Sequence, residues 1–94
     1  MPLTILYLSH CPYCLSLKRA ITELTEQNPA YRAVPVTWIE EALQPTLADK
    51  YDYWYVPSIF MGAEKLFESQ PSDNYTTLKA AMEQAFLTAL AAKA

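Results

Sequence analysis

The sequence is poor in the residues on which many catalytic sites depend. Its 94 residues include one glycine, one histidine and two cysteines. A glycine-rich phosphate loop needs several glycines, and a Ser-His-Asp triad would have to use the single histidine, His10. No such set and no carboxylate pair with catalytic spacing stands out. Most sites of these kinds therefore cannot be assembled from this chain.

The chain also lacks a basic surplus and long apolar runs. Seven Lys and Arg against ten Asp and Glu give a net charge of -3. This balance disfavours nonspecific nucleic-acid binding, because a phosphate backbone needs a basic face. No apolar run approaches the roughly 20 residues of a membrane span, and the first residues have no basic n-region of a signal peptide. We therefore expect a cytoplasmic protein with no nucleic-acid or membrane partner.

Length and composition predict one globular domain over residues 1–94. A content of 52% hydrophobic and 18% charged residues is typical of a compact chain and not of a disordered one. A chain of this size buries roughly two thirds of its unfolded surface, which is enough for one modest core.

The spacing of the apolar residues predicts four strands and three helices. Short apolar runs indicate strands at residues 4–8, 34–39, 58–61 and 65–67, with a turn at 62–63. Apolar residues that recur every three or four positions indicate a helix at 12–27 and a second at 40–51, which Pro45 limits or kinks. A third helix is expected after a cap at 71–73. The order β-α-β-α-β-β-α predicts an α/β fold with a mixed four-stranded sheet and helices packed on it.

The two cysteines, Cys11 and Cys14, are only three residues apart. A disulfide across so small a ring constrains little of the unfolded chain, so the pair is poorly suited to stapling the fold. It falls where a strand leads into a helix, whose unpaired N–H groups and dipole stabilise a thiolate. We expect Cys11 toward solvent as the attacking thiol and Cys14 on the buried face as the resolving thiol. The competing interpretation is two small apolar residues that happen to have this spacing.

The tetrapeptide Cys11-Pro12-Tyr13-Cys14 after a strand resembles the active-site motif of the dithiol glutaredoxins. A second landmark is similar: Val56-Pro57 leads into a strand that ends at Gly62. The resemblance covers the chain from about Thr4 to Phe86. It implies a thioredoxin-like fold in which Pro57 is cis and faces the cysteines; the alternative is an ordinary trans proline at a strand edge. It also implies a monomeric thiol-disulfide oxidoreductase that reduces protein disulfides and glutathione mixed disulfides. Glutathione would be the reducing co-substrate, and no bound cofactor is expected.

The resemblance also suggests which residues hold glutathione. Backbone pairing at Val56-Pro57 and the groove beside Tyr13 are expected contacts, and Lys50 is a candidate partner for the glycine carboxylate. Glutaredoxins usually have a Gly-Gly pair followed by acidic residues that hold the glutathione amine, and the Gly-Gly pair is absent here. Two pairs remain as candidates for the γ-glutamyl end of glutathione, Ser72-Asp73 and Glu68-Ser69. The latter is similar to the Glu-Ser pair of glutathione transferases. The competing roles are a helix cap for Asp73 and a solvated helix end for Lys50.

Three further features leave the function open. His10 stands where glutaredoxins often have a basic residue, and it either supports the Cys11 thiolate or is simply exposed. Tyr53, Trp54 and Tyr55 precede Val56-Pro57 and form either a docking patch for a protein or part of the core. The alternatives to a glutathione-linked enzyme are a redoxin reduced by thioredoxin reductase and a carrier of an iron–sulfur cluster. A mononuclear metal site is not expected, because Cys11, Cys14 and His10 give at most three ligands.

Overall fold

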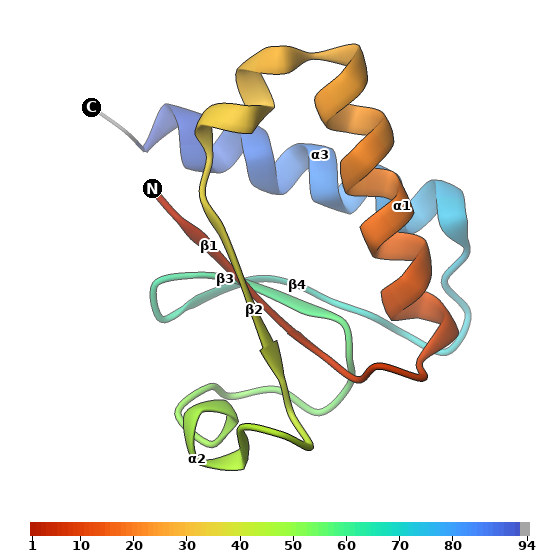
Figure 1. Cartoon of the computed structure of the whole chain (residues 1–94), viewed down its shortest axis with the longest axis vertical. Coiled ribbons are helices and arrows are strands. Elements are labelled where there is room, and N and C mark those ends of the chain that lie inside the picture. The colour runs from red at the N-terminus through yellow and green to blue at the C-terminus, as the bar shows by residue number, and fades with distance from the viewer. Residues whose placement is uncertain (93–94) are drawn as a thin grey trace.

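Four strands form one mixed sheet in the computed structural model, which describes residues 1–92 (Figure 1). The strand order is β2-β1-β3-β4, with β1 parallel to β2 and antiparallel to β3, and β3 antiparallel to β4. The strands are β1 (Leu3–Tyr7), β2 (Val36–Glu40), β3 (Ser58–Met61) and β4 (Glu64–Glu68). The predicted α/β architecture with a mixed four-stranded sheet is confirmed.

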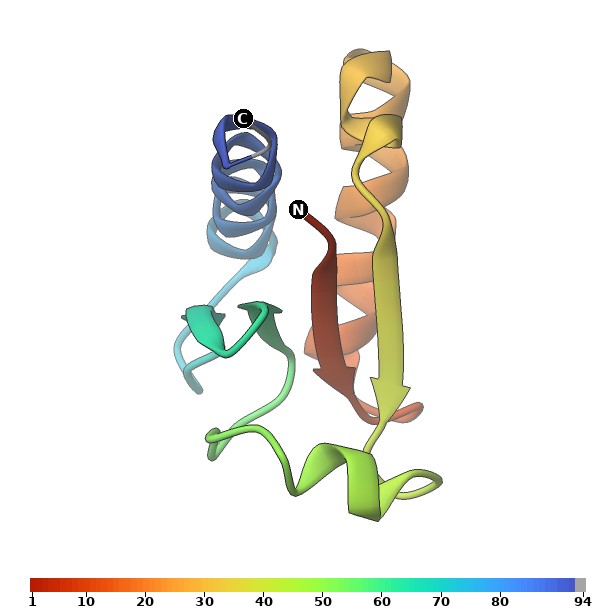
Figure 2. The same cartoon turned by 90° about the vertical axis from the view of Figure 1, so that its left-hand side faces the viewer.

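Two long helices pack against each other and against the sheet, and a short one lies apart from them (Figures 1 and 2). Figure 2 shows α1 beside β1 and β2, with α3 on the side of β3 and β4. The helical elements are α1 (Pro12–Gln27), the 3-10 helix η1 (Pro29–Ala33), α2 (Pro45–Ala48) and α3 (Tyr75–Ala91). Within residues 1–92, no helix has the length and apolar character needed to cross a membrane.

The core has two parts because successive side chains on a strand point to opposite faces of the sheet. Leu3 and Ile5 of β1 belong to the larger part, with the buried faces of α1 and α3. Leu6 belongs to the smaller part, with Phe60 of β3 and Ala48 of α2. The last helix packs on the larger part through residues at helical spacing, since its Leu78, Met82 and Phe86 are fully buried and Leu90 packs at the edge.

The predicted helix over residues 40–51 is wrong. Glu40 ends β2, where it pairs with Tyr7 of β1, and its carboxylate Oε1 accepts a 2.8 Å hydrogen bond from the backbone N–H of Ala42. That bond starts a turn and not a helix. Helix α2 has only four residues, and Pro45 is its first residue, where a missing N–H costs nothing. The first, second and fourth strands also differ from the prediction by one or two residues at their ends.

The only glycine of the sequence lies in a turn that requires a left-handed backbone conformation. Gly62 has a φ of +62° in the two-residue turn between β3 and β4. A residue with a side chain is strained in this left-handed conformation, whereas glycine adopts it freely. The predicted turn at 62–63 and the antiparallel pairing of the strands around it are both confirmed.

Helix α3 is capped by Asn74 and not by the predicted Pro71-Ser72-Asp73 segment. The Asn74 side chain Oδ1 accepts a 2.9 Å hydrogen bond from the backbone N–H of Thr77, which satisfies one of the unpaired donors of the first turn. Asp73 instead closes the preceding turn, where its Oδ2 accepts a 2.7 Å bond from the N–H of Gln70.

Replacing the capping residue is expected to destabilise the protein. Asn74→Ala removes the cap and should lower the free energy of unfolding by about 1 kcal/mol, which corresponds to a fall in Tm of about 4–8 °C for a domain of this size. Thermal denaturation followed by circular dichroism measures the shift. Thr76→Ala, at an exposed position in the same helical turn, is the control and should change stability by less than about 0.5 kcal/mol. Equal effects of the two substitutions would contradict the assignment of the cap.

Candidate active site

Cys11 lies at the junction between β1 and α1, where it is the N-cap residue of the helix. Ser, Thr, Asp or Asn usually fill this position and bond back to the helix with their side chains. The Cys11 side chain makes no such bond, and its backbone is extended, with φ -80° and ψ 121°. Its thiol instead points across to the loop before β3 and donates a long hydrogen bond of 3.8 Å to the carbonyl oxygen of Val56. Cys11 is half-buried, and its sulfur faces the loop that contains Val56.

Cys14 lies one turn further along α1 and is only 1% exposed. Its side chain packs on the same buried helix face as Leu17, Ala20 and Leu24. Burial raises the pKa of the Cys14 thiol to about 12, and the adjacent Cys11 adds to the increase. Both cysteines are free thiols. The exposures agree with the roles predicted from the sequence, which remain to be tested by chemistry.

The Val56-Pro57 peptide bond is cis, as expected from the resemblance. Two hydrogen bonds hold the chain on either side of it. The carbonyl of Pro57 accepts a 3.0 Å bond from the N–H of Ser69 at the end of β4, and the Ser58 hydroxyl donates a 2.6 Å bond to the carbonyl of Tyr55. The Val56 carbonyl is thereby fixed opposite the Cys11 sulfur. The structure thus brings Cys11, Val56 and Pro57 together, as predicted.

Glu68 is fully engaged in holding the aromatic loop that precedes Val56. Its Oε2 accepts hydrogen bonds from the backbone N–H groups of Trp54 and Tyr55, the latter at 2.7 Å. Its Oε1 forms a 2.8 Å ion pair with Lys65. Burial alone would raise the pKa of this carboxyl, but the ammonium and the two N–H groups outweigh burial and lower it. The aromatic loop, residues 53–55, is therefore fastened to β4 through its backbone.

Ser69, Asp73 and Tyr13 meet at a second corner of the site. Ser69 is 1% exposed, and its hydroxyl donates a 3.3 Å hydrogen bond to Oδ2 of Asp73. The Tyr13 hydroxyl donates a 2.7 Å bond to the carbonyl of Pro71, which ties the start of α1 to the connection between β4 and α3. The side chain of Lys50, another predicted glutathione contact, makes no hydrogen bond or ion pair within residues 1–92. It is exposed, two residues beyond α2.

A pocket that the sequence did not reveal lies against Cys11. Its volume is about 540 Å³, and one wall is the connection between β1 and α1. Glu40, which forms part of the opposite wall, is 8% exposed; its two carboxylate oxygens accept hydrogen bonds from the N–H of Ala42 and, at 3.2 Å, from the Ser9 hydroxyl. The lining consists of Leu8, Ser9, His10, Cys11, Glu40, Ala42 and Leu43. A charged residue at the end of a buried strand was the only signal of this pocket in the sequence.

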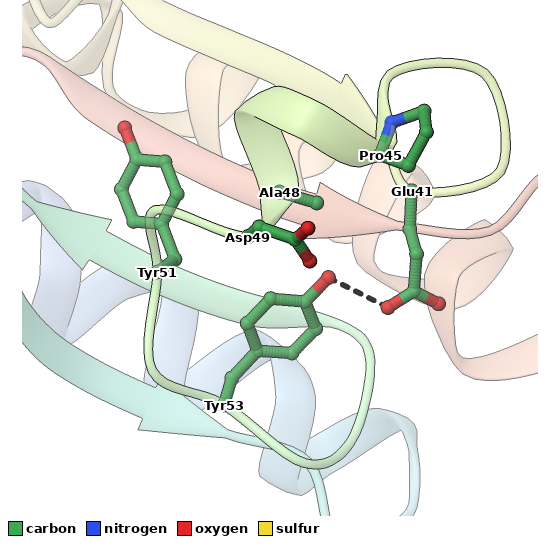
Figure 3. Close-up of a pocket in the computed structure, with 6 residues that line it drawn as sticks. All are labelled: Glu41, Pro45, Ala48, Asp49, Tyr51 and Tyr53. Atoms are coloured by element: carbon green, nitrogen blue, oxygen red, sulfur yellow. Dashed lines mark hydrogen bonds between the residues drawn. The ribbon is translucent and has the colours of Figure 1, made fainter.

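A second, smaller pocket of about 210 Å³ opens beside α2 (Figure 3). Figure 3 shows Glu41 and Tyr53 pointing toward each other across it, and the Tyr53 hydroxyl donates a 2.6 Å hydrogen bond to Glu41. Burial and this bond raise the pKa of Tyr53, so the hydroxyl stays protonated at neutral pH. Pro45, Ala48, Asp49 and Tyr51 complete the lining.

Metal ligands are not gathered anywhere in residues 1–92: no group of three or more His, Cys, Asp or Glu side chains is placed to hold an ion. The chain matches no protein-family model, and it matches no curated protein. The chemistry of the site therefore has to be argued from its geometry.

The two thiols should differ sharply in reactivity. In Cys11→Ser, the contribution of Cys11 to the raised pKa of Cys14 is lost but burial, the largest cause, remains. The rate of iodoacetamide modification of Cys14 should therefore keep rising with pH above about pH 8.5, where that of a free cysteine levels off. In Cys14→Ser, Cys11 should react faster at every pH, because its sulfur is more accessible. Denatured protein is the control, where both rates should level off near pH 8.5, as for free cysteine. A Cys14 rate that levels off there in the folded protein would contradict the burial argument.

Removing the hydrogen bonds that Glu68 accepts from the aromatic loop should make the loop more mobile. Glu68→Ala leaves the N–H groups of Trp54 and Tyr55 without their acceptor, so their amide hydrogen exchange should accelerate roughly tenfold or more while the core helices stay protected. Hydrogen exchange followed by NMR measures this residue by residue. Glu64→Ala, at an exposed position of the same strand, is the matched control and should leave both amides unchanged. Unchanged exchange in Glu68→Ala would show that other contacts hold the loop.

Proposed function

We propose that this protein is a thiol-disulfide oxidoreductase of the glutaredoxin type, built on a thioredoxin-like fold. The observation that carries the proposal is the pairing of two unlike cysteines at the start of α1. Cys11 is accessible and faces the Val56 carbonyl, whereas Cys14 is sealed beneath it one turn away. A strand-to-helix junction that presents one thiol and buries the other suits a two-step exchange with a disulfide. The mixed sheet, in which β1 leads through a short connection into α1, supports the assignment of a thioredoxin-like fold.

The proposed reaction transfers two electrons from the dithiol to a substrate disulfide. The Cys11 thiolate attacks one substrate sulfur and forms a mixed disulfide, and the other substrate sulfur leaves as a thiolate that takes up a proton. Cys14 then loses its proton and attacks the Cys11 sulfur. This second exchange forms the Cys11–Cys14 disulfide and releases the remaining substrate thiol. Two molecules of glutathione restore the dithiol and leave as glutathione disulfide.

The high pKa of the Cys14 thiol supports this order of events. A thiol with a pKa of about 12 is almost wholly protonated at neutral pH, so it does not compete with Cys11 for the substrate. Once Cys11 is in the mixed disulfide, the adjacent thiol that helps to raise the pKa of Cys14 is gone. Burial also keeps the resolving sulfur away from solvent until its target lies next to it.

The proposed glutathione contacts follow from which groups remain free. Both oxygens of Glu68 are occupied by Lys65 and the aromatic loop, so this carboxylate serves the loop and not the ligand. Asp73 uses only Oδ2 within the described residues, which favours its Oδ1 as the acceptor for the glutathione ammonium. Val56 offers its backbone as an added strand would, with Tyr13 along the groove. Lys50 would have to reach the ligand on its flexible side chain from its position two residues beyond α2.

The proposal also has a close competitor that shares the same chemistry. The Gly-Gly pair that accompanies glutathione binding in glutaredoxins is missing, and Glu68 is committed elsewhere. These observations favour a redoxin whose dithiol is restored by thioredoxin reductase. The two candidates differ only in the reductant, so one coupled assay separates them.

The assay follows NADPH consumption with a glutathione mixed-disulfide substrate in two systems. One contains glutathione and glutathione reductase, and the other contains thioredoxin reductase alone. Activity in the first system supports the glutaredoxin proposal, and activity only in the second supports the competitor. Inactivity in both, with absorbance near 400 nm in freshly purified protein, would replace both by the iron–sulfur carrier.

Single substitutions at the two cysteines should have different effects. Cys11→Ser removes the attacking sulfur, so turnover should fall to the uncatalysed background. Cys14→Ser should lose reduction of protein disulfides but accumulate a stable mixed disulfide, detectable as added mass, and retain removal of glutathione from a mixed-disulfide substrate. Circular dichroism controls for the fold of both variants. An exchange of the two behaviours would reverse the assigned roles.

A further inference from the structure

The net charge of this protein is confined to one segment. Residues 40–55 contain four acidic residues, Glu40, Glu41, Asp49 and Asp52, and one basic residue, Lys50. The remainder of the chain carries six acidic and six basic residues and is neutral. The whole net charge of -3 therefore belongs to residues 40–55, the end of β2 and most of its connection to β3, referred to below as the acidic segment.

The acidic segment also exposes large apolar side chains. Trp54 is 85% exposed, Leu43 77%, Tyr55 51% and Leu47 39%. These are four of the seven large hydrophobic side chains exposed among residues 1–92. The exposure of Trp54 and Tyr55 is not that of a loose loop, because Glu68 holds the backbone N–H groups of both. Aromatic side chains on a fixed backbone lose little conformational freedom on contact, which suits them to binding a partner.

Both ends of the acidic segment lie at Cys11. At its start, Glu40, Ala42 and Leu43 line the 540 Å³ pocket that Cys11 also lines. At its end, Tyr55 leads into Val56, whose carbonyl accepts the Cys11 thiol. The segment thus begins at a pocket that Cys11 also lines and ends next to Val56, which contacts the Cys11 sulfur. A molecule that presents a disulfide to Cys11 therefore approaches beside it.

We propose that the acidic segment is the docking surface for a polypeptide substrate whose disulfide cysteine has basic and apolar neighbours. The exposed carboxylates of Asp49 and Asp52 attract the basic side chains. The apolar neighbours contact Leu43 and Trp54, and the pocket beside Cys11 receives the residue next to the substrate cysteine. The charge complementarity identifies the occupant. Glutathione carries two carboxylates and an ammonium, so the segment repels it on balance, and a second copy of this chain would present the same negative charge to itself. The role of the segment in turnover rests on the proposed function, whereas docking does not.

Binding of a peptide that cannot react tests the docking directly. Two fluorescein-labelled peptides carry serine in place of cysteine between leucines, and either arginines or glutamates flank this core. Fluorescence anisotropy should show the basic peptide binding about tenfold or more tightly than the acidic one at about 50 mM salt, and the difference should shrink at about 500 mM. Equal affinities at low salt would overturn the proposal.

Matched variants separate this surface from the general charge of the protein. Asp49→Asn with Asp52→Asn removes two charges from the acidic segment and should weaken the basic peptide about fivefold or more. Glu26→Gln with Glu64→Gln removes two exposed charges elsewhere and should have little effect; an equal loss in both pairs would overturn the proposal. Trp54→Ala should weaken binding at both salt concentrations, because its contact is apolar. Sedimentation that shows self-association abolished by Trp54→Ala would assign the face to a second copy instead.

The same peptides with a cysteine in mixed disulfide with 2-mercaptoethanol extend the test to turnover. Faster reduction of the basic peptide, lost in Asp49→Asn with Asp52→Asn, supports the docking surface as part of the enzyme. Reduction of neither peptide together with selective binding would refute the proposed function and leave the docking intact. Equal reduction of both without selective binding would refute the docking and leave the proposed function intact.

Discussion

The position of strand β1 in the middle of the sheet is the constraint on which the candidate site depends. β1 ends in the connection to Cys11, and its parallel neighbour β2 ends at the same edge with Glu40. Its antiparallel neighbour β3 begins at that edge, which brings Val56-Pro57 to the same place. Three parts of the chain that are far apart in the sequence are therefore collected around one sulfur by hydrogen bonding between backbones.

Around that sulfur, the structure separates two kinds of task. Burial sets the chemistry of Cys14, because it holds the thiol in its protonated form beneath Cys11. In the proposed docking, surface charge and exposed aromatic groups on the connection between β2 and β3 select what approaches Cys11. The burial of Cys14 depends on the core and α1, whereas the charged and aromatic groups belong to a loop outside both. A change in one can therefore leave the other largely intact.

The sequence predicted those parts of the structure that depend on local pattern. The long helices, the four strands and the difference in burial between Cys11 and Cys14 follow from apolar spacing and were found as expected. The error at residues 40–51 has a tertiary cause, since pairing of Glu40 with Tyr7 extends β2 against the helical pattern. The pocket beside Cys11 and the engagement of Glu68 were not predictable either. Both are made by residues distant in the sequence, whose contacts no periodicity encodes.

The manner in which Glu68 holds the aromatic loop has a consequence for how recognition can change. The carboxylate binds the N–H groups of Trp54 and Tyr55 and does not touch their side chains. Every amino acid except proline has that N–H group, so the loop keeps its shape whichever side chains it displays. Positions 54 and 55 are therefore open to substitution without refolding of the loop. Under the proposed docking, substitutions at these two positions alone would change the partner, while Cys11 and Cys14 stay as they are.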